Sequence, residues 1–482
     1  MPSVPSRHRA QRQAMRALLP AALAALLLAP AAAGAALERG AGGEVHEFRL
    51  DNGLKILVKE DHRAPVAVSQ LWYRVGSSHE RPGATGISHL LEHLMFKGTP
   101  RHPAGEFSRI IAQLGGRENA FTARDYTAYF QTLAADRLEK AFELEADRMA
   151  HLLLDETEFL KEREVVMEER RLRTEDDPEA LTYEAFQATA FLHAPYRNPV
   201  IGWMDDLRRL TVEQVRDWYR RWYGPDNAVL VVVGDVDPQR ILALARKHFG
   251  PLRPRREAVR DAPLREPALR GERRVTVRAP AKVPYLILGY RVPSLRTAAE
   301  PWEAYALDVA AAVLAGGESA RLPRELVRGR RLAAAADAGY SAASRLDTLF
   351  LLDATPAPGR ALAELEEALR SQVRRLREEP VSAQELERIK TQVIASDVYR
   401  RDSMFYQAMV MGRLESVGLG WRLIEEYVDR IRAVTPEQVQ AVARRYLVDE
   451  RLTVAVLEPL PMERSGEGAR GRDHAEGKGH DR

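Results

Sequence analysis

The feature of this 482-residue chain that most constrains its fold is an internal repeat with an offset of 224 positions. In each copy, a threonine begins a T-x-E-Q-V segment, which is followed by a helical pattern, a tyrosine and an apolar strand. Threonine is a preferred N-cap residue, so a helix is expected to start at the same point in both copies. The matching segments are 211–215, Tyr223 and 228–233 in the first copy, and 435–439, Tyr446 and 452–457 in the second.

A second pair of similar segments lies near the start of each copy. Residues 65–75 read PVAVSQLWYRV, and residues 284–292 read PYLILGYRV. Two copies of a unit that mixes strands and helices indicate a duplication. We therefore predict an α+β fold of two homologous α/β-sandwich halves, each with a mostly antiparallel sheet and helices packed on it.

The composition between and beyond the repeats suggests where the segments begin and end. Residues 251–272 are rich in Pro and Arg without a clear period, which is typical of a linker. The two halves are then expected at 44–250 and 273–460. Residues 463–482 hold mainly Gly, Arg, Asp and His without apolar anchors, so we predict a disordered tail there.

The first 35 residues have the features of a secretory signal peptide. Arginines between positions 7 and 16 precede an Ala/Leu-rich run at 17–29, and an A-x-A cleavage site follows at 33–35. The run is short for a membrane span, although an uncleaved anchor is the alternative. We expect a cleaved signal peptide at 1–35, a periplasmic location and no stable membrane span after cleavage.

The charge balance argues against a nucleic-acid partner. Without the four arginines of the signal peptide, the 72 basic residues fall to 68, against 69 acidic residues. The mature chain is therefore nearly neutral, and its basic character comes from the removed segment. The chain has no cysteine, which excludes disulfides, cysteine–metal sites and a thiol nucleophile.

The most informative motif is His89-Leu-Leu-Glu-His93, an H-x-x-E-H sequence. Residues 87–95 follow an amphipathic helical pattern, with Gly98 as a helix stop. His89, Glu92 and His93 fall together on the face opposite the apolar one. Two neutral imidazoles four residues apart can bind one zinc ion, and Glu92 can then act as general base. The alternative is a surface helix with two solvated histidines.

A carboxylate is expected to complete the metal site, and the acidic segment 159–170 is the richest source of one. Glu162 and Glu169 are seven residues apart, which is two helical turns, so they share a face. One could bind the metal while the other holds a ligand through a hydrogen bond. Periodicity alone does not choose Glu169 over Glu168 or Glu164, and such helices are often solvated ion-pair surfaces.

With Glu169 placed 76 positions after His93, the chain resembles the zinc metallopeptidases of the pitrilysin and mitochondrial processing peptidase type. The likeness extends over about residues 45–458. It implies a clam-shell of two halves that cleaves peptides by metal-activated water attack. The similar segments are FKGT at 96–99, ENAFT at 118–122, residues 196–203 and YGPDN at 223–227.

The resemblance also assigns roles to individual residues. It makes His89, His93 and Glu169 the ligands of one Zn²⁺ per chain, Glu92 the general base and Glu162 the second glutamate of the family's E-x6-E pair. Family members bind peptide as an added strand on an exposed sheet edge. Asn119 and Ala120 match the residues that hold this strand, although Asn119 could also be an ordinary turn residue.

One departure from the family pattern bears on partners. Many active members carry an Arg and a Tyr seven residues apart in the second half, and Val327 and Ala334 occupy those positions here. We therefore expect a heterodimer in which a homologous subunit supplies the Arg/Tyr pair. A displaced alignment, or substitution by Arg328 or Arg330, would instead leave the chain self-sufficient.

Three classes of function remain open at this stage. The leading one is a periplasmic zinc endopeptidase that acts on peptides or unfolded polypeptides. A catalytically silent assembly or binding subunit and a self-sufficient homodimeric peptidase are the alternatives. A metal-dependent hydrolase of another bond lacks support, since no phosphate loop or sugar site is evident.

Overall fold

The computed structural model describes residues 43–255, 264, 266–268 and 270–462. The predicted signal peptide at 1–35, the tail at 463–482 and part of the linker at 251–272 lie outside these residues. No described helix is long and apolar enough to span a membrane.

The first half is built on a six-stranded sheet with the order β1-β2-β6-β3-β5-β4. Only β2 and β6 run parallel, and all other neighbours are antiparallel. The strands are β1 (Val45–Arg49), β2 (Lys55–Glu60), β3 (Val66–Tyr73), β4 (Arg117–Thr122), β5 (Thr127–Ala134) and β6 (Ala228–Gly234).

The second half repeats this arrangement without the first strand. Its order is β7-β11-β8-β10-β9, and again only one pair, β7 and β11, is parallel. The strands are β7 (Arg273–Pro280), β8 (Tyr285–Val292), β9 (Ala333–Gly339), β10 (Thr348–Pro356) and β11 (Leu452–Leu460). The repeated segments found in the sequence occupy equivalent strands, β3 with β8 and β6 with β11. The predicted α+β fold of two similar halves is therefore confirmed.

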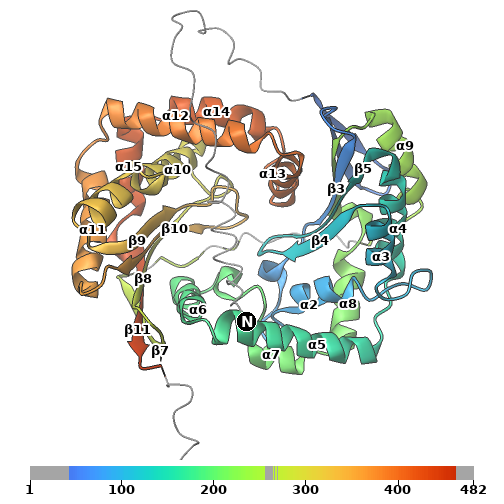
Figure 1. The fold of residues 1–482 in the computed structure, drawn as a ribbon, viewed down its shortest axis with the longest axis horizontal. Helices are drawn as coiled ribbons and strands as arrows, with labels where there is room; N and C mark the ends of the chain where they lie inside the picture. The colour runs from blue at the N-terminus through green and yellow to red at the C-terminus, as the bar shows by residue number, and fades with distance from the viewer. Residues whose placement is uncertain (1–42, 256–263, 265, 269, 463–482) are drawn as a thin grey trace, which may run out of the picture.

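Helices cover both sheets (Figure 1). In the first half they are α2 (Ile87–Leu94), α3 (Glu106–Gln113), α4 (Leu138–His151), α5 (Glu156–Arg170), α6 (Pro178–Ala190), α7 (Met204–Arg209), α8 (Val212–Trp222) and α9 (Pro238–His248). In the second half they are α10 (Pro301–Ala315), α11 (Leu362–Glu378), α12 (Ala383–Arg400), α13 (Met404–Ser416), α14 (Leu423–Ala433) and α15 (Pro436–Tyr446). Short helical turns join them, including η1 (Ser77–His79), η3 (Arg171–Glu175), η4 (Pro195–Arg197) and η6 (Leu322–Gly329).

The two repeated threonines cap equivalent helices. Thr211 precedes α8 and Thr435 precedes α15, and each hydroxyl accepts a hydrogen bond from a backbone N–H three residues later. The residue at that third position is a glutamine, Gln214 or Gln438, whose side chain bonds back to the threonine N–H. Both helices therefore start with a complete capping box, which fixes the point where the chain enters the helix.

One helix of each half packs on the sheet of the other half. Helix α6 packs on β7 and β11, where Phe186 and Ala190 are buried in a core with Ile287 and Ala455. Helix α13 packs on β3 and β6 through Ala408 and Met411. Figure 1 shows α6 beside the second sheet and α13 beside the first. The two halves are consequently joined by apolar cores that belong to both.

Candidate active site

The motif helix α2 is held at its N-terminus by a buried carboxylate. Glu80 accepts hydrogen bonds from the backbone N–H groups of Gly86 and Ser88 at 2.8 and 2.9 Å. Gly86 has φ 86, and a Cβ there would lie 2.5 Å from the Ile201 carbonyl oxygen. The apolar face of the helix is buried, as predicted, through Ile87, Leu90, Leu91 and Leu94. The helix ends at Leu94, before the predicted stop at Gly98, which has φ 96 and forms an isolated antiparallel β-bridge with Pro103.

His89, His93 and Glu169 come together on the other side of α2. Glu169 Oε1 lies 3.8 Å from His89 Nε2, and Glu169 Oε2 lies 3.4 Å from His93 Nε2. One ligand atom from each residue can be chosen so that all three lie within 4.8 Å of one another. Donor atoms about 2 Å from a tetrahedral zinc ion are roughly 3.3 Å apart, so this arrangement fits zinc with little adjustment.

Helical periodicity left open which glutamate of α5 is the third metal ligand, and the structure distinguishes among the candidates. Glu168 points to solvent with a 57% exposed side chain and pairs with Arg171 at 2.7 Å. Glu164 is also exposed, with Arg163 at 3.8 Å. Glu169 is 15% exposed and faces both histidines. Of the three candidates on α5, Glu169 alone is placed to share a metal ion with His89 and His93.

The two histidines of the cluster differ in charge when no metal is bound. Burial lowers the pKa of His89 to about 4, and the nearby charge of His93 acts in the same direction. Burial also tends to lower the pKa of His93, but hydrogen bonds with Glu162 and Glu169 outweigh it and raise the pKa to about 9. At neutral pH, His89 is therefore neutral and ready to bind a metal, whereas His93 carries a proton.

Glu162 lies where the E-x6-E pair predicts, behind His93. Its Oε2 is 3.2 Å from His93 Nδ1, and its Oε1 is 2.5 Å from Lys97 Nζ. A carboxylate on Nδ1 keeps the proton on that nitrogen and directs Nε2 toward Glu169. The sequence reasoning missed Lys97, although it lies in the FKGT segment that carried part of the resemblance.

Glu92 is held by the sheet edge. The hydroxyl of Thr122 at the end of β4 donates to Glu92 Oε2 at 2.5 Å. Burial raises the pKa of Glu92 above its ordinary value, although this hydrogen bond opposes the effect. A carboxylate with a raised pKa accepts a proton more readily, which suits a general base. Thr122 was not singled out from the sequence, because only the fold brings β4 to α2.

Arg173 is a further residue that the sequence reasoning missed. Its guanidinium contacts Glu169 Oε1 from η3, a π-helical turn that directly follows α5. The side chain is 45% exposed, so it can move away from Glu169 without breaking a buried contact. Burial acts to raise the pKa of Glu169, but the hydrogen bond with His93 and the charges of His89 and Arg173 lower it to about 2. Glu169 is therefore ionised at every physiological pH.

Asn119 and Ala120 lie on β4, the last strand of the first sheet. They pair with Phe130 and Tyr129 of β5, and no described strand pairs with the other edge of β4. Asn119 is therefore a strand residue and not part of a turn. Its Oδ1 accepts a hydrogen bond from the Ala120 N–H at 2.8 Å. Because the Asn119 side chain already accepts a hydrogen bond from the Ala120 N–H, this backbone donor is less available to another chain. Edge strands in native proteins commonly limit pairing with other chains.

The second half does not place an Arg/Tyr pair at the expected positions. Val327 lies in η6 and Ala334 in β9. Arg328 is one of the two arginines that could replace the missing Arg of this pair, and it is hydrogen-bonded to Glu318 of its own half.

Comparison with known proteins agrees with these observations. Residues 55–203 match the family described as Insulinase (Peptidase family M16), and residues 209–393 match the family described as Peptidase M16 inactive domain. The zinc protease PqqE of Helicobacter pylori is 32% identical over 419 residues, which are 85% of this chain and 92% of that protein. The chain belongs to the M16 family of peptidases.

Two further relatives extend the comparison. An uncharacterized zinc protease of Streptomyces coelicolor, SCO5738, is 31% identical over 87% of this chain and 90% of its own length. The crystal structure of a protease from Helicobacter pylori superposes with a TM-score of 0.82 at 32% identity, covering 86% of this chain and all of the other. The match to Insulinase (Peptidase family M16) at residues 55–203 includes His89, Glu92, His93 and Glu169, and the match to the inactive domain begins after them, at residue 209.

Proposed function

We propose that this M16 chain is a zinc-dependent endopeptidase that cleaves peptides or unfolded polypeptides. The observation that carries the proposal is the convergence of His89, His93 and Glu169, with Glu92 on the same face of α2. A zinc ion held by these three residues would polarise the peptide carbonyl and make a water molecule more acidic. The names of the zinc protease relatives support zinc as the metal.

Glu92 has the central role in moving protons. Its carboxylate accepts a proton from the attacking water and later delivers one to the leaving amine. Thr122 fixes one carboxylate oxygen through its hydrogen bond, so the other oxygen, Oε1, is left for the proton. Glu162 and Lys97 do not touch the reacting atoms, and they hold His93 in the orientation that the metal needs.

Peptide binding is assigned to the exposed edge of β4. An extended substrate can add to this edge as another strand, with backbone hydrogen bonds that do not depend on side-chain identity. The Asn119 side chain must then release the Ala120 N–H, which becomes the donor to the substrate. This mode of binding favours extended or unfolded polypeptides over folded proteins.

A homologous partner subunit and a periplasmic location complete the proposal. The absence of the Arg/Tyr pair at Val327 and Ala334 supports a partner that supplies these groups. The signal-like composition of residues 1–35 supports export and cleavage.

Metal analysis with an activity assay tests the central claim. The purified chain is expected to hold about one zinc ion, and a His89→Ala/His93→Ala double variant is expected to hold none. Zinc-loaded protein, alone or with its partner, should cleave an unstructured peptide, and the double variant should not. Stoichiometric zinc without cleavage in either form would instead identify a silent binding subunit.

A further inference from the structure

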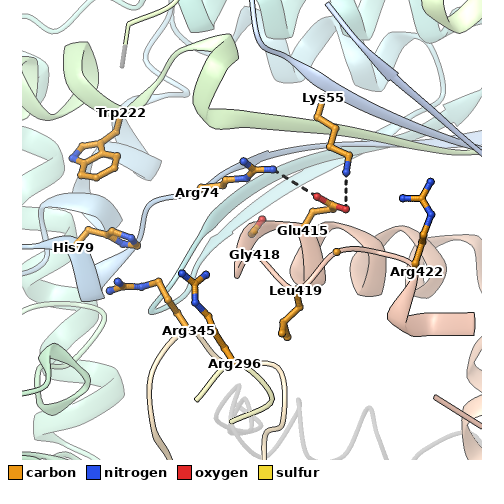
Figure 2. A pocket seen from close by; sticks show the side chains of 12 residues that line it. Lys55, Arg74, His79, Trp222, Arg296, Arg345, Glu415, Gly418, Leu419 and Arg422 are labelled. Atoms are coloured by element: carbon orange, nitrogen blue, oxygen red, sulfur yellow. Dashed lines mark hydrogen bonds and ion pairs between the residues drawn. The ribbon is translucent and has the colours of Figure 1, made fainter. Parts of the chain in front are cut away.

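The crevice in Figure 2 lies between the two halves, and its charged groups are engaged with one another. Glu415 Oε1 lies 2.9 Å from Lys55 Nζ, and Glu415 Oε2 lies 3.6 Å from Arg74 Nη2. Arg345 pairs with the buried Asp125 at 3.4 Å. These ion pairs connect residues of the first half with residues of the second, so they act as contacts that join the halves.

A second crevice, of about 280 Å³, is also lined by both halves. The first half contributes residues that include Arg124, Gln187, Phe191 and Tyr196, and the second half contributes residues of β10 such as Leu349. This α6 pocket takes its name from the helix that carries Gln187. None of its lining residues belongs to the metal cluster or to the Asn119–Ala120 edge.

Gln187 is a buried polar residue of the α6 pocket with one unsatisfied atom. The residue is 5% exposed, and its Nε2 donates to the Tyr183 hydroxyl at 2.8 Å. Its Oε1 is buried and has no hydrogen-bond partner among the described residues. Native proteins leave few buried polar atoms without partners, so Gln187 Oε1 indicates an N–H or O–H donor that comes from outside the chain. A water molecule occupies roughly 30 Å³, so the pocket has room for a larger group.

Arg124 provides the opposite kind of group to the same pocket. It lies between β4 and β5, and its Nε is a buried donor that has no hydrogen-bond partner in the described part of the chain. The charge of Arg124 is not isolated, because it interacts with Asp125 and lies 5.5 Å from the centre of the Tyr196 ring. What Arg124 offers to a ligand is therefore a fixed N–H donor more than an unbalanced charge.

A ligand that satisfies both atoms must accept from Arg124 Nε and donate to Gln187 Oε1. A primary carboxamide does both, because its carbonyl oxygen accepts and its NH₂ group donates. A carboxylate has no proton to donate and would place an oxygen against Gln187 Oε1. Phe191, Tyr196 and Leu349 are at most 5% exposed and belong to one apolar core. They form walls that suit the CH₂ groups of a glutamine or asparagine side chain.

Contacts between the halves hold one of these walls in place. Tyr196 Oη donates to the Asp125 carboxylate and accepts from the backbone N–H groups of Arg345 and Leu346 at 3.1 and 3.2 Å. Because the aromatic ring is already fixed, little side-chain entropy is lost when a ligand binds beside it.

The α6 pocket lies near the end of the proposed peptide edge. Arg124 is two residues after Thr122, the last residue of β4 and the hydrogen-bond partner of Glu92. The Cα atoms of Thr122 and Arg124 are therefore at most about 7 Å apart. A substrate strand that continues past the end of β4 needs few further residues to place a side chain in the pocket.

We propose that the α6 pocket is a specificity subsite that binds the carboxamide of a glutamine or asparagine side chain in the substrate peptide. The proposal rests on the endopeptidase function proposed above. In this subsite, Arg124 Nε donates to the carboxamide oxygen and Gln187 Oε1 accepts from its NH₂ group.

A series of otherwise identical unstructured peptides tests this subsite. Each peptide carries Gln, Asn, Glu or Met at one position, and the position is scanned across both sides of the scissile bond. Cleavage is measured with the zinc-loaded full chain, with its partner subunit where turnover requires one. Affinity is measured separately, by fluorescence anisotropy, with the Glu92→Gln chain. At one position, a carboxamide should improve kcat/KM and affinity by about tenfold over Met, which has a similar size and no amide.

Two variants and a control assign this preference to the pocket. Gln187→Met removes the acceptor at similar size, and Arg124→Lys keeps the charge and removes Nε. Each should reduce the preference for Gln over Met and leave cleavage of the Met peptide unchanged. Gln239→Met, at an exposed position of α9, is the matched control and should keep the preference. Melting temperatures identify a variant that fails to fold, in which case the other variant decides.

The outcomes separate this proposal from the proposed function. A carboxamide preference in binding without cleavage of any peptide supports the subsite and contradicts the endopeptidase. Cleavage without a carboxamide preference at any position, or with a preference for Glu over Gln, overturns the subsite and leaves the endopeptidase standing. A preference that survives both Arg124→Lys and Gln187→Met overturns the subsite as well, and so does a chain that binds none of the peptides. A preference for Gln over Asn, or the reverse, supports the proposal and shows which side chain the pocket fits.

Discussion

Thr122 Oγ1 donates a 2.5 Å hydrogen bond to Glu92 Oε2, and this contact connects the proposed peptide-binding edge of β4 to the proposed general base. Glu92→Gln should retain zinc and lose turnover by several orders of magnitude, because the amide cannot accept the water proton. Thr122→Val keeps the shape of the side chain and removes the hydrogen bond, so a smaller loss in kcat is expected. Steady-state kinetics and zinc content measure both effects, and substantial activity in Glu92→Gln would contradict the mechanism.

Glu169 and Glu168 are neighbours on α5 with opposite surroundings, so they form a matched pair of variants. Glu169→Ala should lower zinc occupancy, because one of three ligands is lost, and Glu168→Ala should leave it unchanged. Both variants remove one carboxylate from the same helix, which controls for net charge. Elemental analysis after dialysis gives the result, and loss of zinc in Glu168→Ala alone would move the third ligand by one residue.

Zinc binding should depend on pH through a single proton. His93 has a pKa of about 9 in the metal-free chain, so it is protonated below that pH and must lose its proton to bind zinc. His89, with a pKa of about 4, and Glu169, with a pKa of about 2, are already deprotonated above pH 5. The zinc association constant should therefore rise about tenfold per pH unit from pH 6 and level off near pH 9.

Competition with a chelator across this pH range measures the slope. Glu162→Gln removes one of the carboxylates that raise the pKa of His93, so the plateau should move to lower pH. Glu164→Gln, on the exposed side of the same helix, should leave the profile unchanged. If the zinc association constant does not change with pH, or changes about a hundredfold per pH unit, the charge states of the two histidines differ from those described.

Most residues of the candidate metal site could be proposed from the sequence, because their grouping depends on the helical period. Residues spaced by three, four or seven positions share a helix face wherever the helix lies, so His89, Glu92, His93 and the pair Glu162 and Glu169 were predictable. The choice of Glu169 over Glu168 required the resemblance, since both alternatives lie on one acidic helix. Only the packing of α5 against α2 shows which of them faces the histidines.

Contacts between distant elements could not be predicted in the same way. Lys97 and Thr122 contact glutamates on other elements, and nothing in their local pattern distinguishes them from ordinary polar residues. Arg173 differs, because it lies four residues after Glu169 and its contact follows from helical spacing. The sequence also did not predict that α6 and α13 each pack on the sheet of the other half. An amphipathic pattern shows which face of a helix is buried, but it does not show against which of two similar sheets that face packs.

Whether the chain works alone is a separate prediction. The purified, zinc-loaded and monodisperse protein should cleave peptides very slowly, because Val327 and Ala334 cannot supply the Arg/Tyr grip. A Val327→Arg/Ala334→Tyr double variant, with each single variant as a control, should gain activity if these positions are aligned correctly. Copurification of a homologous chain that restores turnover would support the heterodimer, and full activity of the native chain alone would refute it.

The packing of α13 on the first sheet depends on Gly412, which lies against the indole of Trp72. A Cβ at position 412 would be 2.1 Å from Trp72 Cε2. Trp72 is fully buried and bonded to Gln70 Oε1 at 3.0 Å, so it has no free space to move into. Gly412→Ala should therefore destabilise the chain by about 1–3 kcal/mol, although alanine is the better helix former at an open position.

Urea unfolding compares Gly412→Ala with the native chain and with a Trp72→Leu background. The smaller leucine leaves room for the added methyl group, so Gly412→Ala should cost less in that background. The two substitutions should thus show a favourable coupling energy, as expected for residues in direct contact. Equal effects in both backgrounds would mean that the cost arises elsewhere. A stabilising effect of Gly412→Ala would mean that α13 does not pack on Trp72 in solution, and that the halves are not joined by this shared core.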